Sequence, residues 1–136
     1  MPKTGQNLNA VDTNVLVRFL TNDDADQAAR ARRLFETESI YLPLTVLLET
    51  FWVLRKLRGL PASTILMQLL AITRFPNVTV EDAPRFERTL ALLEAGMGFA
   101  DALHLSAVEP SVRFATFDRR MSRAAQRAGL QNVFTP

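Results

Sequence analysis

The sequence contains no cysteine, a single histidine and no long uninterrupted hydrophobic segment. Without cysteine there are no disulfides and no thiolate metal sites, so any bound metal must be held by oxygen ligands or by His104. The same absence fits a reducing compartment, and we expect a cytoplasmic protein. The most apolar segment, residues 42–54, is interrupted by Glu49 and is too short to span a bilayer, so no membrane association is expected.

An excess of one charge is also missing, since 16 basic and 14 acidic residues give a net charge of only +2. Nearly all of the basic residues are arginines, which suit bidentate contacts to phosphate. An arginine-rich genomic composition would produce the same count. Composition therefore gives only weak support for a nucleic-acid partner.

The length of 136 residues fits one domain, residues 1–136. Glycine and proline are scattered, so no linker divides the chain. Predicted strands cover 8–11, 40–42, 78–80, 113–117 and 132–134, and predicted helices cover 15–20, 24–37, 44–57, 61–73, 83–95, 99–108 and 119–128. Strands that alternate with helices imply a central parallel sheet covered on both faces. We therefore expect an α/β fold, a three-layer sandwich.

Two acids directly follow predicted strands. Asp12 comes after the first strand and Asp118 follows Thr116-Phe117 at the end of a later one. Each could simply cap the helix that follows, which is worth about 1 kcal/mol. Ligands of open α/β sheets nevertheless gather at the carboxyl ends of strands. Strand alternation would place Thr116 on the same side as Asp118, where it could orient the carboxylate or a bound water.

Glu49 lies in a segment that is apolar nearly all round, which predicts a buried helix. Burying a carboxylate costs several kcal/mol unless it is paired, hydrogen-bonded or bound to metal. No lysine or arginine stands three or four residues away on either side. Two interpretations remain, a long-range ion pair with an arginine and a metal ligand, and the sequence favours the second.

Asp101 begins another apolar segment, Phe99 to Leu105. It could cap that helix or pair with His104. Gly96 and Gly98 precede it and would allow a substrate or another part of the backbone to approach closely. His104 itself is expected to be a packed residue or to support a ligand.

Together, Asp12, Glu49, Asp101 and Asp118 form a set of oxygen ligands. Hard oxygen ligands suit Mg²⁺ or Mn²⁺ rather than zinc. Four carboxylates brought together would repel one another without cations, so the set itself predicts a divalent metal. Two such ions about 4 Å apart can activate water and stabilise the leaving oxygen in phosphodiester cleavage.

The order and spacing of four short motifs resemble the PIN-domain nucleases, in particular the VapC-type ribonuclease toxins of toxin–antitoxin pairs. The motifs are Asp12-Thr13-Asn14, Glu49 in its apolar helix, Phe99-Ala100-Asp101-Ala102-Leu103-His104, and Thr116-Phe117-Asp118. The resemblance covers residues 8–134, nearly the whole chain.

This resemblance implies a parallel-sheet PIN fold and Mg²⁺- or Mn²⁺-dependent endonucleolytic cleavage of RNA that leaves a 5′-phosphate and a 3′-hydroxyl. It implies that the four acids are the catalytic and metal-binding residues, supported by Thr13, Asn14 and Thr116. It also implies a homodimer and a cognate antitoxin protein that obstructs the active site. Many relatives carry a further acid near Gly98, so the number of metal ions per site stays open.

Other functions are compatible with parts of the pattern. A haloacid dehalogenase-like phosphotransferase would use Asp12 as a nucleophile, but it needs a second acid at the position of Asn14. A catalytically weak PIN-like module would act mainly by binding a partner or RNA, but such a module is expected to have lost acids, and all four are present.

Overall fold

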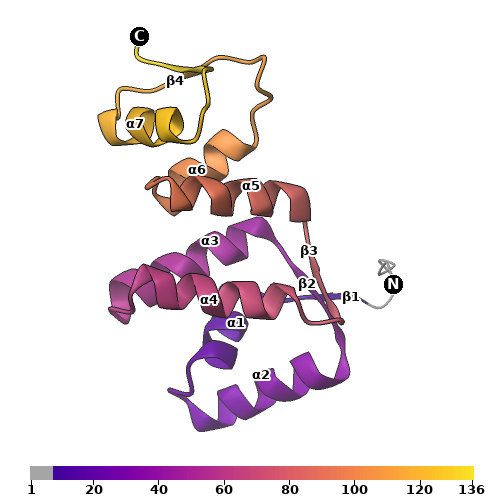
Figure 1. Ribbon diagram of the computed structural model, residues 1–136. Coiled ribbons are helices and arrows are strands. Elements are labelled where there is room, and N and C mark those ends of the chain that lie inside the picture. The colour runs from indigo at the N-terminus through magenta and orange to yellow at the C-terminus, as the bar shows by residue number, and fades with distance from the viewer. Residues whose placement is uncertain (1–7) are drawn as a thin grey trace. The chain divides into compact units, whose positions relative to one another are not determined.

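Parallel strands and helices alternate along residues 8–136, the part of the chain that the computed structural model describes (Figure 1). The chain divides between Glu81 and Asp82 into two units, each with its own core. The N-terminal unit holds three strands and the C-terminal unit holds two. Each unit is described by itself below.

The N-terminal unit is built on a parallel sheet with the order β1-β2-β3. Strand β1 covers Leu8–Ala10, β2 covers Ser39–Leu42 and β3 covers Val78–Val80. Ile40 is opposite Asn9 on one side and Val78 on the other, and its side chain is fully buried. This register fixes the carboxyl end of β1, from which the chain enters the first helix.

Helices connect these strands, as parallel pairing requires. Helices α1 (Thr13–Leu20) and α2 (Ala25–Thr37) join β1 to β2. Helix α3 (Leu44–Trp52) continues into a π-helical turn, η2 (Val53–Leu57), and α4 (Ala62–Thr73) then leads to β3. Helix α1 packs against α2 and α3, and α4 packs against α3 and β3.

The core of this unit contains one face of each helix. In α3, the buried side chains are Leu44, Leu47 and Thr50, spaced at intervals of three residues. Aromatic rings fill the space between α1 and α2, where Phe19 stacks on Phe35 with ring centroids 4.2 Å apart. The apolar residues of α3 therefore form a stripe on one side of the helix rather than a buried cylinder.

The C-terminal unit begins with two packed helices, α5 (Ala83–Glu94) and α6 (Phe99–Ser106). A βαβ unit follows, made of β4 (Phe114–Ala115), α7 (Arg119–Arg127) and β5 (Val133–Phe134). The two strands are parallel, with Phe114 opposite Val133.

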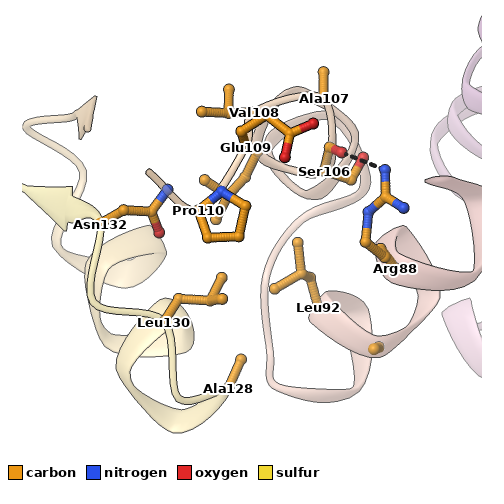
Figure 2. Close-up of a pocket in the computed structure, with 12 residues that line it drawn as sticks. Arg88, Leu92, Ser106, Ala107, Val108, Glu109, Pro110, Ala128, Leu130 and Asn132 are labelled. Carbon is orange, nitrogen blue, oxygen red and sulfur yellow. Dashed lines mark hydrogen bonds between the residues drawn. The ribbon is translucent and has the colours of Figure 1, made fainter. Parts of the chain in front are cut away.

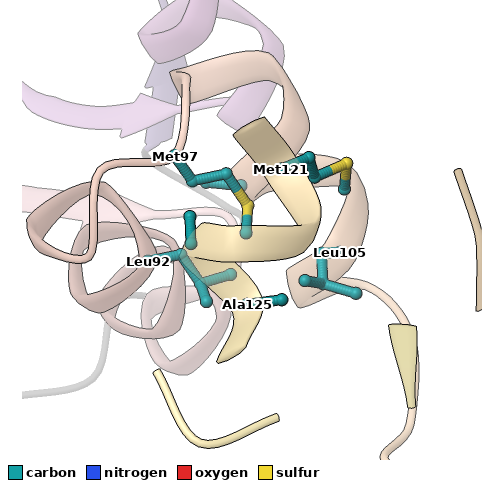
Figure 3. Close-up of a cluster of buried hydrophobic side chains, with 7 residues drawn as sticks. Leu92, Met97, Leu105, Met121 and Ala125 are labelled. Atoms are coloured by element: carbon teal, nitrogen blue, oxygen red, sulfur yellow. The ribbon is translucent and has the colours of Figure 1, made fainter. Parts of the chain in front are cut away.

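One cluster of buried side chains holds these helices together (Figure 3). Leu92 of α5, Leu105 of α6 and Met121 and Ala125 of α7 meet in it, together with Met97 from the turn before α6. The cluster gives α7 one apolar side, so the rest of that helix, which carries four arginines, remains exposed.

The α/β class and the parallel pairing predicted from the sequence are confirmed, and the fold is consistent with the expected three-layer arrangement. The predicted strand at 113–117 is too long, because pairing with β5 covers only Phe114 and Ala115. Thr116 still donates its backbone N–H to the carbonyl of Phe134 at 2.9 Å. Among residues 8–136, no helix has both the length and the apolar character needed to cross a membrane.

Candidate active site

Asp12 caps helix α1 at the end of the first strand. It has extended backbone angles, and its Oδ1 accepts a hydrogen bond from the backbone N–H of Val15 at 3.0 Å. The capping role considered from the sequence is therefore real. Among the contacts of the described residues, this bond engages Oδ1 alone, and the side chain is exposed, so Oδ2 remains available to a ligand. Capping and metal binding are compatible at this residue.

Glu49 is tied to the residue that follows Asp12. The hydroxyl Oγ1 of Thr13 donates a short hydrogen bond, 2.5 Å, to Oε1 of Glu49. This contact joins the first turn of α1 to the middle of α3, across 36 positions of sequence. The structure thus brings Thr13 and Glu49 together, and it sets Glu49 next to the start of the helix that Asp12 caps.

The expectation that Glu49 is buried is wrong. Its side chain is exposed, because α3 turns Leu44, Leu47 and Thr50 inward and leaves Glu49 on the opposite side. No desolvation cost therefore calls for a metal at this position. Within residues 8–136, Thr13 is the hydrogen-bond partner of Glu49, and the long-range ion pair with an arginine does not form.

A hollow of about 290 Å³ lies beside Asp12, between α1 and α2. Asn14, which is exposed, lines it together with Asp12 and two arginines, Arg18 and Arg30. The guanidinium of Arg18 is held by the side-chain oxygen of Gln27, with 2.8 Å between Nε and Oε1. The two arginine side chains beside Asp12 make this hollow suited to an anionic ligand such as a phosphodiester chain. The sequence gives no signal for these two arginines, because their position depends on how α1 packs against α2.

Asp118 occupies in the C-terminal unit the same structural position as Asp12 in the other. It caps α7, and its Oδ1 accepts hydrogen bonds from the backbone N–H groups of Arg120 at 2.9 Å and Met121 at 3.2 Å. Thr116 contributes as well, since its Oγ1 accepts the backbone N–H of Asp118 at 3.0 Å. Thr116 therefore positions the main chain of Asp118 rather than its carboxylate.

Asp101 lies in the first turn of α6 and is half-buried. It does not cap the helix, because Gly98 is the N-cap residue. The alternative pair with His104 is also not formed among the described contacts, and His104 is exposed rather than packed. No hydrogen bond or ion pair within residues 8–136 engages the carboxylate of Asp101, so both of its oxygens remain available to a ligand.

Arginines follow Asp118 immediately along α7. Arg119, Arg120 and Arg123 are exposed, and none of their guanidinium groups is hydrogen-bonded or ion-paired within the described residues. Arg127 differs, because its Nε donates to the carbonyl of Ala95 at 2.8 Å. Three free cations therefore lie within two turns of a candidate ligand.

A second cavity in the C-terminal unit, of about 370 Å³, is separate from these acids (Figure 2). Its wall is mostly apolar, with Leu92, Leu105, Pro110 and Leu130, and Arg88 closes one side through a 3.0 Å hydrogen bond to the carbonyl of Ser106. Neither Asp101 nor Asp118 lines it. This cavity is therefore not the candidate active site.

Each unit carries two of the four predicted acids. Taken unit by unit, the described residues do not assemble three or more histidine or acidic side chains in a metal-binding cluster. The chemistry of the donors fits a hard cation, because Asp12, Glu49 and Asp118 each commit one carboxylate oxygen to a hydrogen bond and keep the other.

The sequence profile of the PIN domain matches residues 10–127, a stretch that includes all four acids. No curated protein matches the chain.

Proposed function

This chain belongs to the PIN domain family, and on that premise we propose that it is a magnesium-dependent endoribonuclease that serves as the toxin of a toxin–antitoxin pair. PIN domains are generally nucleases that hydrolyse phosphodiester bonds. The choice of metal, the preference for RNA and the toxin role go beyond the family.

The proposed metal ligands are Asp12, Glu49, Asp101 and Asp118, with Mg²⁺ or Mn²⁺ as the ion. A bound ion of this kind would supply an activated water and offset the negative charge on the phosphate. The observation that carries this assignment is the hydrogen bond from Thr13 to Glu49, which holds a second carboxylate next to the start of the helix that Asp12 caps.

Neighbouring polar groups hold Asp12 and Asp118 in place. The capping hydrogen bond from Val15 holds the side chain of Asp12. The backbone N–H groups of Arg120 and Met121 both donate to Oδ1 of Asp118 and hold its side chain in the same way. Thr116 fixes the backbone just before α7. Removing a hydrogen bond that holds a metal ligand in this way typically lowers the metal affinity of the site about 10- to 100-fold.

RNA is the proposed substrate. Arg18 and Arg30 line the hollow that begins at Asp12, and three free arginines follow Asp118. These cations suit a polyanionic backbone. By resemblance to VapC-type toxins, the products are a 5′-phosphate and a 3′-hydroxyl.

The toxin role and the partners are proposed from the same resemblance, and the cytoplasmic location is proposed from the absence of cysteine. We propose a homodimer and a cognate antitoxin that covers the acids. Features of the sequence alone support these points, and expression of the chain in a bacterial host tests the toxin role. Growth arrest by the wild-type chain but not by Asp101→Asn is the expected result.

A cleavage assay tests the nuclease proposal. The purified full chain is incubated with end-labelled RNA in Mg²⁺, in Mn²⁺ and with EDTA, and the product ends are identified. Cleavage that requires the metal and is lost in Asp101→Asn supports the proposal. The alternative of a catalytically weak module predicts RNA or protein binding without cleavage under any metal, and that result would overturn the enzyme assignment.

A further inference from the structure

The cavity of about 370 Å³ in the C-terminal unit lies at the opposite edge of the small sheet from Asp118. Part of its lining comes from residues 107–110, which precede β4, and part from residues 128–132, which precede β5. Since the two strands are parallel, these turns share one edge, whereas Asp118 follows β4 at the other. We propose that the cavity binds a free α-amino acid with an apolar side chain. This goes beyond the proposed nuclease function and does not depend on it.

The helices that carry two of the candidate acids end at this cavity. Asp101 lies in the first turn of α6, whereas Leu105 and Ser106 at the end of that helix line the cavity. Asp118 caps the start of α7, and Ala128, which follows the last turn, lines the cavity. At about 1.5 Å per residue, Asp118 and Ala128 are about 15 Å apart along the helix axis. A ligand in the cavity therefore occupies a site of its own.

Most of the cavity wall is apolar. Leu92 and Leu105 are buried and Leu130 is half-buried, and they come from α5, from α6 and from the turn after α7. Figure 2 shows Leu92 and Leu130 facing each other across the open space, with Pro110 at its rim. Pockets for small molecules usually measure about 300–1,000 Å³ and have mostly apolar walls. A cavity at the lower end of this range fits one apolar side chain with a small polar head.

Two opposite charges line the same cavity without pairing. Arg88 and Glu109 both contribute to the lining, yet no ion pair joins them among the described residues. Nη2 of Arg88 donates a hydrogen bond to the carbonyl of Ser106 at 3.0 Å, which orients the guanidinium and engages one of its nitrogens. The carboxylate of Glu109 has no hydrogen bond or ion pair within residues 8–136. A cation and an anion are therefore both available to a ligand.

Asn132 adds a third polar group to the lining. Its Nδ2 donates a hydrogen bond to the carbonyl of Val112 at 2.9 Å, which fixes the side-chain amide and leaves Oδ1 as an acceptor. An ammonium group only donates, so it suits Glu109 and Oδ1 of Asn132. A carboxylate suits the guanidinium of Arg88, which binds such groups through two parallel hydrogen bonds.

This pair of charges distinguishes among possible ligands. A hydrocarbon would leave both charges unpaired, and a simple carboxylate would bring a second negative charge into the cavity that Glu109 lines. An internal segment of a partner protein has neither a free ammonium nor a free carboxylate on its main chain. A free α-amino acid carries both groups on one carbon, and its side chain can enter the apolar part. A few placed polar groups in an apolar pocket are the usual basis of ligand orientation and specificity.

A titration of the isotope-labelled full chain with L-leucine in EDTA tests the site, with the backbone amides followed by two-dimensional NMR. A ligand of this size is expected to bind with a Kd of about 1 mM or lower. The amide signals of Ser106, Ala128 and Leu130, which line the cavity, should shift. Shifts confined to residues outside the cavity, or no shifts at about 10 mM leucine, overturn the proposal.

Three relatives of leucine test the parts of the proposed ligand. Isocaproate lacks the ammonium group, isoamylamine lacks the carboxylate, and L-serine lacks the apolar side chain. Each should bind at least about 10-fold more weakly than leucine, because each loses a charged hydrogen bond or the burial of an apolar group. Isocaproate or isoamylamine that binds as tightly as leucine would overturn the assignment of a ligand with both charges. Serine that binds as tightly would overturn the role of the apolar wall.

Substitutions in the lining locate the two charges. Arg88→Met and Glu109→Gln keep side chains of similar length, and each should weaken leucine binding about 10-fold. Glu109→Gln should not weaken binding of isocaproate, which has no ammonium group, and a general structural effect would not depend on the ligand in this way. Matched controls are Arg32→Met on α2 and Glu94→Gln at the end of α5, both exposed and outside the cavity, which should bind leucine as wild type. Wild-type affinity in Arg88→Met and in Glu109→Gln would refute the charge assignment.

Failure of this inference is distinguishable from failure of the nuclease proposal. Asp101→Asn should bind leucine with unchanged affinity in EDTA and in Mg²⁺, because none of the candidate acids lines the cavity. Leucine binding by a chain that cuts no RNA supports the ligand site and leaves the nuclease proposal to its own assay. Metal-dependent cleavage without leucine binding overturns the ligand site and leaves the enzyme assignment standing. A leucine affinity that falls in Asp101→Asn would place the ligand at the acids and overturn the inference.

Discussion

Asp12 performs a structural task and, by our proposal, a chemical one, and two substitutions separate them. Asparagine is as good an N-cap as aspartate, so Asp12→Asn keeps the hydrogen bond to the N–H of Val15 and removes only the charge. Alanine removes both. The prediction is that stability and activity respond differently to the two changes.

The magnitudes follow from the single capping bond. Asp12→Ala is expected to cost about 1 kcal/mol of unfolding free energy, which lowers the Tm by about 4 °C in a domain of this size. Asp12→Asn should leave the Tm of the metal-free protein within about 1 °C of wild type, because an exposed substitution that keeps its bond changes stability little. Both variants should lose at least about 100-fold in cleavage rate, since a ligand to the catalytic ion is gone.

Thermal unfolding in EDTA and RNA cleavage in Mg²⁺ measure the two effects separately. The informative variant is Asp12→Asn, which should be as stable as wild type and inactive. The contrary result has two parts: Asp12→Asn cleaves RNA at the wild-type rate, and Asp12→Ala loses activity only in proportion to its lower stability. Asp12 would then act only as a helix cap. The metal assignment would then be refuted at this residue.

Further expectations concern other parts of the two units. Asp118→Asn should likewise keep the fold and abolish cleavage, whereas Asp118→Ala, which loses two capping bonds, should cost about 1–2 kcal/mol in urea unfolding. Thr13→Val should weaken Mn²⁺ binding about 10-fold or more in calorimetry, with Thr13→Ser close to wild type; equal affinities in the two variants would contradict the role of the hydroxyl. Gly96→Ala and Gly129→Ala both place a side chain at positive φ, which costs about 1–2 kcal/mol. Gly96→Ala should cost more, because only its Cβ would meet a neighbour, Arg127 Nη2 at 2.7 Å, and equal losses would show that Arg127 moves aside freely.

Local signals in the sequence predict most of the helices and strands. Asp24 illustrates this: the acid before an alanine- and arginine-rich segment predicts a helix start, and in the structure its Oδ1 accepts the N–H of Gln27. The predicted strand 78–80 is also found as such. Capping bonds and side-chain periodicity join residues a few positions apart, so they are visible in the sequence.

Long-range pairing is not visible in this way. The strand predicted at 113–117 ends at Ala115 because its partner, β5, is only two residues long. Glu49 is a second example: its helix is apolar enough to be buried on every side, and only packing against α1 and α4 decides that Glu49 faces outward. The bond from Thr13 that then holds it spans 36 positions and has no local signature. The four acids were predicted from their types and spacing, and their metal role stays a prediction.

The wrong expectation about Glu49 changes the physical argument for the site. A buried carboxylate would have required a cation for its own stability, whereas each of the four acids has a local source of stabilisation. Asp12 and Asp118 accept amide N–H groups at the starts of α1 and α7, Asp101 lies in the first turn of α6, and Glu49 accepts the hydroxyl of Thr13. Negative charge at a helix start is favoured by about 0.3–1 kcal/mol, and a hydrogen bond adds a comparable amount. The hydrogen bonds of Asp12, Glu49 and Asp118 hold these three carboxylates without a metal, and Asp101 gains the favourable field of its helix start, so we expect each unit to fold without the proposed ion.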